Sequence, residues 1–205
     1  MTIIPPMLIW KSFDFFFIME ETLLITGTLV SDQTCISDKN LIQDLTQKGY
    51  GDIENDKLFL KSFETLYFLY SDKLILHKGK KQINFDSFMN ICQKSDSDSL
   101  TKFLIYRDLR NRGYVVKDGF GFGSDFRVYE RGHFGNKSAK FLIFGLNEGQ
   151  QDKMGNLQKK IEQITQMGKE PIIAVIERRG EVIYYKINKI NFNENKANQT
   201  EKFDI

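Results

Sequence analysis

The alternation of apolar and polar residues predicts most of the elements in the second half of the chain. Residues 100–112 have the spacing of a helix that ends at Gly113. Residues 124–130 alternate as a strand does, with Phe126 and Val128 on one face and the polar side chains on the other. A glycine-rich stretch that precedes this strand indicates a tight turn.

The last third of the chain predicts a strand, a helix and a strand, followed by a hairpin. Residues 139–146 and 171–176 are apolar runs of strand length, and residues 156–167 carry apolar side chains at helical spacing. This order predicts two parallel strands joined by a right-handed crossover. A turn at residues 179–180 then leads into a further strand at 182–190.

The first half shows a mixed pattern of short elements. Strand-like patterns occur at residues 23–30 and 73–81, and helical spacing occurs at 37–48, 62–70 and 85–92. Together the two halves indicate an α+β or α/β protein. We expect a small mixed N-terminal domain, followed by a domain with a central mixed β-sheet flanked by helices.

A polar run at residues 93–99 marks the expected domain boundary. We therefore assign an N-terminal domain to residues 19–95, a C-terminal domain to 99–192 and a flexible tail to 193–205. Residues 1–18 are apolar but are interrupted by charges, with neither a basic start nor a small-residue cleavage site. We expect a disordered leader or an upstream start-codon artefact there, or else a short amphipathic segment that packs on the body.

Composition limits the possible functions. The 205 residues are 41% hydrophobic and 13% aromatic, enough for a sizeable core, and the net charge of +2 gives no whole-chain argument for nucleic-acid binding. Two cysteines and two histidines exclude a disulfide framework and a four-cysteine zinc site. The longest apolar run is too short for a membrane span. We expect a cytoplasmic protein without metal or cofactor.

Charge is nevertheless concentrated locally. Residues 102–140 hold nine basic and four acidic side chains, an excess of five positive charges. Such an excess suits either a phosphate-contacting surface or a solvated helix face with strand edges.

Three side chains in this half could carry chemistry. Tyr129 shares a strand face with a cation, so it could serve in proton transfer or simply pack. His133 lies in a polar loop, and Lys169 follows a helix-ending glycine, where it could cap the helix or reach a phosphate. The glycine-rich stretch lacks the lysine of a phosphate-binding loop.

Taken together, these residues resemble one family. The segment YRDLRNRGYVVKDGFGFGSDFRVYERG at 106–132 closely resembles the signature of archaeal tRNA-intron splicing endonucleases. KFLIFGLNEG follows where that family has its next strand, and GKEPIIAVIERRGEVIYY at 168–185 resembles its closing lysine, strand and hairpin. The resemblance covers roughly residues 20 to 190, with a looser match in the first half.

The resemblance implies both an assembly and a reaction. The family forms four-unit particles with two active sites, which here would contain this chain, a paralogous subunit or both. Its substrate is a precursor tRNA with a bulge-helix-bulge at the exon–intron junctions, which presents unstacked nucleotides to a protein. Cleavage without metal gives a 2′,3′-cyclic phosphate and a 5′-hydroxyl, with a tyrosine base, a histidine acid and a stabilising lysine.

The family's tyrosine and lysine correspond to Tyr129 and Lys169, but its histidine position holds Ser138. His133, five residues earlier, could act only as a relocated acid. Family cations are also replaced at Gly121, Glu162 and Gly168. By resemblance, we expect the acidic residues of the hairpin turn, Glu177 and Glu181, to contact another subunit. We expect the cations near the site to contact RNA: Arg127, Arg131, Lys137 and Lys140.

Three hypotheses follow. The missing histidine and lost cations favour a structural subunit that holds a catalytic paralogue and helps to grip RNA. Retention of Tyr129 and Lys169 favours the alternative, a catalytic subunit that uses His133. The third, from another class, is an RNA-binding or protein-interaction module without nuclease activity.

Overall fold

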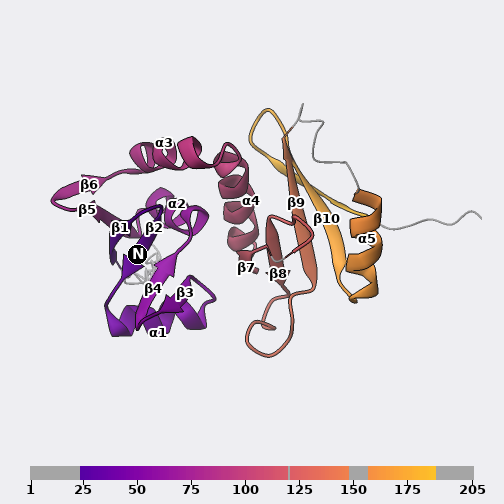
Figure 1. The fold of residues 1–205 in the computed structure, drawn as a ribbon, viewed down its shortest axis with the longest axis horizontal. Coiled ribbons are helices and arrows are strands. Elements are labelled where there is room, and N and C mark those ends of the chain that lie inside the picture. The colour runs from indigo at the N-terminus through magenta and orange to yellow at the C-terminus, as the bar shows by residue number, and fades with distance from the viewer. Residues whose placement is uncertain (1–23, 120, 148–156, 188–205) are drawn as a thin grey trace, which may run out of the picture.

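A computed structural model describes residues 24–119, 121–147 and 157–187 (Figure 1). The expectations for a leader at 1–18 and a tail at 193–205 lie outside these residues. In the described part, two mixed sheets with five helices form an N-terminal and a C-terminal unit.

The N-terminal unit is built on a six-stranded sheet with the strand order β3-β4-β2-β1-β5-β6. Strands β1 and β5 are parallel, and every other neighbouring pair is antiparallel. Its elements in chain order are β1 (Ile25–Val30), β2 (Gln33–Ile36), α1 (Lys39–Gln47), β3 (Asp52–Glu54), β4 (Lys57–Leu60), α2 (Ser62–Tyr70), β5 (Leu74–Lys78), β6 (Lys81–Ile83) and α3 (Phe85–Ser95).

Local sequence explains these elements. Strand β1 alternates buried and exposed residues, so its apolar side chains enter the core that α2 and α3 also share. Asp38 and Asn84 are the N-cap residues of α1 and α3, and their side chains accept hydrogen bonds from backbone N–H groups of the first turn.

Two features differ from the sequence-based prediction. The pattern did not reveal β2, β3, β4 and β6, because strands of three or four residues are too short to show a period. Helix α3 also continues through Ser95, so the break between α3 and α4 is only Asp96–Asp98. Burial of Phe88, Met89 and Cys92 holds α3 together although its last turn is polar.

The C-terminal unit is a five-stranded mixed sheet between two helices, as predicted. The strand order is β11-β10-β9-β8-β7, with β9 and β10 parallel and the other pairs antiparallel. The strand–helix–strand order and the closing hairpin are thereby confirmed. Its elements are α4 (Ser99–Asn111), β7 (Val115–Asp118), β8 (Phe126–Tyr129), β9 (Phe141–Asn147), α5 (Leu157–Gln166), β10 (Glu170–Ile176) and β11 (Val182–Lys186).

The two helices cover opposite faces of this sheet. Helix α4 lies between the N-terminal unit and this sheet, and α5 lies on the far side of the sheet (Figure 1). Ile105 and Tyr106 of α4 share a core cluster with Phe126 and Val128, whereas Ile164 of α5 packs with residues of the other sheet face. Because side chains alternate along a strand, this arrangement fixes which face each β8 residue occupies.

The two units are joined through buried apolar and polar contacts. Phe63 of α2 packs against Tyr106 of the C-terminal unit with its ring tilted, and it meets the Phe126 ring edge to face. The Lys117 ammonium, on β7, donates to the Gly51 carbonyl and lies 3.0 Å from a carboxylate oxygen of Asp52. The Lys117 contacts place Gly51 and Asp52, which follow α1, beside β7.

Candidate active site

The strand register brings Tyr129 and Lys169 to the same end of the sheet. Tyr129 is the last residue of β8, whose Val128 pairs with Phe141 of β9, and the Lys140 N–H donates to the Val128 carbonyl at 3.0 Å. Glu170 opens β10 opposite Phe141, and its N–H donates to the Lys140 carbonyl at 2.9 Å. Tyr129 and Lys169 therefore flank Lys140 on either side.

This arrangement sets the separation of the two backbone positions. Neighbouring strands lie about 4.8 Å apart, so the backbones of residues 129 and 169 are roughly 10 Å apart across β9. Phe126 and Val128 are buried toward α4, so by alternation Tyr129 lies on the opposite face, as the sequence predicted. A phenol and an ammonium at that spacing can approach one small anion between them.

Lys169 is held at this place by its neighbours in the chain. Its backbone N–H donates to the Ile164 carbonyl at 3.1 Å, so it closes the end of α5. Its side-chain ammonium donates to the Ala139 carbonyl at 2.6 Å, just before β9. The half-buried side chain is thus turned toward the strand that separates it from Tyr129.

The ring of Tyr129 is packed by the following loop. The Phe134 ring meets it edge to face, with centroids 5.1 Å apart and an interplanar angle of 89°. Phe134 also lies against Gly49, because a Cβ built on that glycine would be 3.2 Å from the Phe134 ring. The loop after β8 is therefore held between Tyr129 and the N-terminal unit.

His133 lies in this loop and is bound on both ring nitrogens. Nδ1 is 3.2 Å from a carboxylate oxygen of Glu130, and Nε2 is 3.4 Å from the ammonium of Lys137. When Nδ1 donates to Glu130, Nε2 is left to accept from Lys137. Nε2 must give up the Lys137 contact before it can donate to a leaving oxygen.

Glu130 organises the site in a way that sequence analysis missed. One of its oxygens contacts His133, and the other accepts from the Lys140 ammonium at 2.5 Å. The hydrogen bond from Lys140 lowers the pKa of Glu130, and the same contact raises the pKa of Lys140. The spacing of three residues between Glu130 and His133 was the sequence feature that could have indicated this contact.

The four cations expected to contact RNA have different environments. Lys140 faces two carboxylates, since Glu170 lies 3.9 Å from it in addition to Glu130. Lys137 and Arg131 are exposed, and the Arg131 guanidinium lies 5.2 Å from the Tyr114 ring centroid. Arg127 is half-buried, and its Nε has no hydrogen-bond partner among the described residues.

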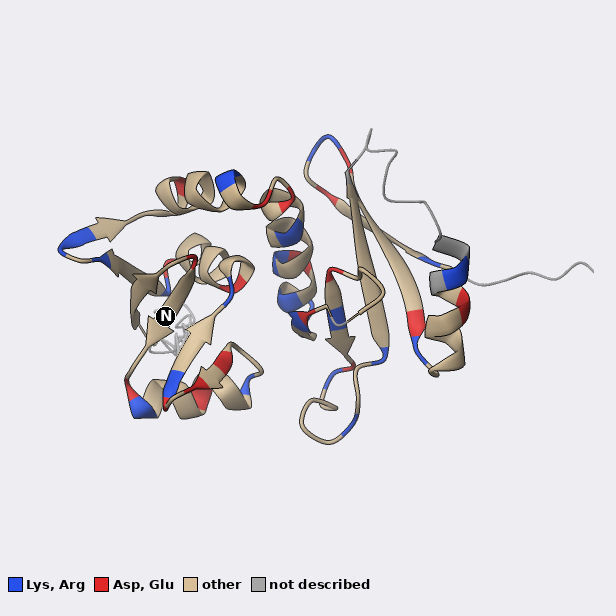
Figure 2. Cartoon of the chain, in the orientation of Figure 1, with Lys and Arg blue, Asp and Glu red and all other residues tan. Residues whose placement is uncertain are grey.

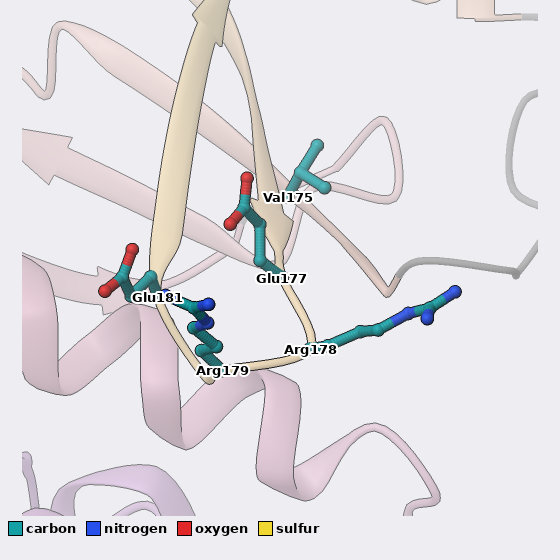
Figure 3. Close-up of a pocket in the computed structure, with 5 residues that line it drawn as sticks. All are labelled: Val175, Glu177, Arg178, Arg179 and Glu181. Carbon is teal, nitrogen blue, oxygen red and sulfur yellow. The ribbon is translucent and has the colours of Figure 1, made fainter.

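The β10–β11 turn carries the expected interface residues. Glu177 and Glu181 stand at its two ends, where the Glu177 N–H donates to the Glu181 carbonyl at 3.0 Å. Both arginines of the turn lie between them, and Arg178 points away from the carboxylates (Figure 3). These side chains and Val175 line a hollow of about 480 Å³ with mixed charge.

The described residues contain no group of three or more histidine, cysteine or acidic side chains that could hold a metal ion. In the same part of the chain, none of the helices is long and apolar enough to cross a membrane.

Comparison with known proteins gives one consistent result. A sequence profile described as tRNA intron endonuclease, catalytic C-terminal domain, matches residues 99–184, and one for the N-terminal domain of the same family matches 25–89. A "tRNA-splicing endonuclease" of Thermococcus gammatolerans is 31% identical over 170 residues, which cover 82% of this chain and all of that protein. Similar proteins with the same name come from Thermococcus kodakarensis, at 32% identity over the same shares, and from Methanococcus vannielii, at 32% over 80% of this chain and 93% of that protein.

Proposed function

Since this chain belongs to the tRNA intron endonuclease family, we propose that it is a subunit of an endonuclease that cuts precursor tRNA at bulge-helix-bulge exon–intron junctions. Within that enzyme its role is structural: it holds a catalytic paralogue in place and contributes to RNA binding. The observation that carries this choice is the loop after β8, where exposed Ser138 occupies the family's histidine position and His133 is engaged by Glu130 and Lys137.

The reaction proposed for the complete enzyme needs no metal. A tyrosine phenolate takes the proton of the ribose 2′-hydroxyl, and the freed 2′-oxygen forms a bond to the adjacent phosphorus. The bond from phosphorus to the 5′-oxygen breaks, and that oxygen receives a proton from an acid. A lysine ammonium stabilises the added negative charge on the phosphoryl oxygens. The products are a 2′,3′-cyclic phosphate and a 5′-hydroxyl.

Tyr129 and Lys169 are the counterparts that we propose in this chain for two of these three groups. The register that sets Tyr129 and Lys169 on either side of Lys140 suits a base and a charge stabiliser acting on one phosphate. The acid is the missing part. Loss of a positioned general acid slows a reaction by roughly 10²–10⁴-fold, enough to make the chain inactive by itself.

A second candidate is a catalytic subunit in which His133 is the acid. One observation favours it: Phe134, the next residue, packs on the Tyr129 ring, so His133 is anchored near the candidate base. It would have to exchange its Lys137 contact for the leaving oxygen.

The test is cleavage of a bulge-helix-bulge precursor tRNA in EDTA, by the full chain alone and with a paralogue that has the complete Tyr/His/Lys set. We expect the wild-type chain to cleave only with the paralogue. Ser138→His should give the chain activity of its own, which a further Tyr129→Phe change abolishes.

Three results would contradict parts of this proposal. Cleavage by the wild-type chain alone that His133→Ala abolishes would establish the second candidate. Activity that EDTA removes would contradict the metal-free reaction. A chain that neither binds nor helps to cleave precursor tRNA with any paralogue would refute the proposed function.

A further inference from the structure

The hairpin between β5 and β6 ends in a cluster of exposed lysines. Lys78 and Lys81 face each other as the last pair of the ladder, and Lys80 lies in the two-residue turn between them. All three side chains are exposed. Figure 2 shows this blue tip at the end of the molecule opposite α5, beyond the helices of the N-terminal unit. We call these three lysines the basic tip.

The hairpin supports the basic tip on buried side chains. Leu76 and Ile83 face each other two pairs further into the sheet, and both are buried in the N-terminal core. Because side chains alternate, Lys78 and Lys81 continue the face that Leu76 and Ile83 bury. The strands run past the core at this point, so the same face becomes solvent-exposed and carries charge. The ammonium groups are thus held on a well-anchored hairpin.

The charge of the basic tip is not balanced by ion pairs among the described residues. Many other cations of the described chain pair with carboxylates, such as Lys48 with Asp44 at 2.8 Å and Lys102 with Asp96 at 2.6 Å. Within the described residues, no lysine of the tip forms an ion pair. Three like charges on neighbouring residues repel one another, which an anionic partner relieves.

We propose that the basic tip binds the sugar–phosphate backbone of the precursor tRNA, away from the bond that is cut. This inference rests on the proposed function, which supplies the RNA. Lysines act as point charges toward phosphates and are indifferent to sequence. Residues 78–81 are three lysines and a glycine, with no aromatic side chain to stack on a base, so the contact is with phosphates. This contact raises the affinity of the enzyme for precursor tRNA and leaves the chemistry of cleavage unchanged.

The test compares two triple variants that remove the same charge. The first is Lys78→Gln, Lys80→Gln and Lys81→Gln. The control changes three exposed lysines that also lack ion pairs within the described chain but lie on separate elements: Lys39 on α1, Lys57 on β4 and Lys94 on α3. The dissociation constant for full-length precursor tRNA is measured from 50 to 200 mM salt, with the full chain and its catalytic paralogue.

Each phosphate contact contributes about 0.7–0.9 to the slope of log affinity against log salt. We therefore expect the tip variant to bind more weakly and to lose about 2–3 from the slope, while the control keeps nearly the wild-type slope. In cleavage assays the tip variant should raise KM and leave kcat unchanged.

Unchanged RNA binding in the tip variant would overturn the inference and leave the lysines as protection of the exposed β6 edge. An equal loss in both variants would overturn it too, because net charge alone would then explain the effect. In either case, binding of precursor tRNA by the wild-type complex would leave the proposed function intact. Failure of the wild-type complex to bind precursor tRNA would overturn both.

Discussion

Gly49 offers a quantitative test of how the N-terminal unit supports the candidate active site. Its φ is 75°, and a Cβ at this position would lie 2.4 Å from Val115 Cγ1 of β7 and 3.2 Å from the Phe134 ring. Gly49→Ala therefore adds a methyl group where β7 and the loop after β8 both meet the end of α1. Gly180 is the matched control, since its φ is 77° and a Cβ there would meet nothing within 4 Å.

The two substitutions share one cost and differ in another. A side chain in the left-handed region costs about 1–2 kcal/mol, and this applies equally to Gly49→Ala and Gly180→Ala. The gain from a stiffer unfolded chain also cancels between them. Forcing a methyl group into occupied space costs about 1–3 kcal/mol more, and only Gly49→Ala bears that cost.

Chemical denaturation and thermal unfolding measure this difference directly. We expect Gly49→Ala to be about 1–3 kcal/mol less stable than Gly180→Ala, which lowers the Tm by roughly a further 2–12 °C for a chain of this size. Hydrogen exchange should also become faster in residues 130–137 of Gly49→Ala, because Phe134 must move. Equal destabilisation by the two changes, with an unaltered loop, would refute the reasoning.

Three further predictions concern individual groups. Asp125→Ala should cost about 1–3 kcal/mol in urea unfolding, because its carboxylate accepts from the Gly145 N–H at 2.7 Å and that donor would lose its partner; no loss would show that water replaces it. Burial raises the pKa of Tyr50 to about 12, so its stabilising contribution, present below pH 10, is lost as pH rises toward 12; Tyr50→Phe should flatten that alkaline decline in stability. The hydrogen bond from Lys140 lowers the pKa of Glu130, so the stability that Glu130 contributes is present above about pH 4.5 and is lost as pH falls through the lowered pKa. Glu130→Gln should therefore reduce the dependence of the unfolding free energy on pH in acid. An identical dependence in the variant and the wild type would contradict the assignment.

Much of the C-terminal fold could be predicted because its elements are long enough to show a period. The alternation of β8 placed Phe126 and Val128 in the core and Tyr129 on the other face, and the structure confirms it. The short strands β2, β3, β4 and β6 could not be predicted, because their residues are selected by pairing with neighbouring strands and show no period of their own. The alternative roles of His133 stay predictions.

The sequence alone indicated the family and the order of the elements in the C-terminal unit, and it marked Tyr129, Lys169 and Ser138 as the positions to compare with the family's catalytic set, since periodicity and motif spacing are local properties of the chain. Tertiary structure alone decided which groups meet. The register of β8, β9 and β10 sets Tyr129 and Lys169 on either side of Lys140, and loop folding ties His133 to Glu130. Register and loop packing depend on hydrogen bonds and side chains that are distant in sequence, and no local pattern encodes those distances.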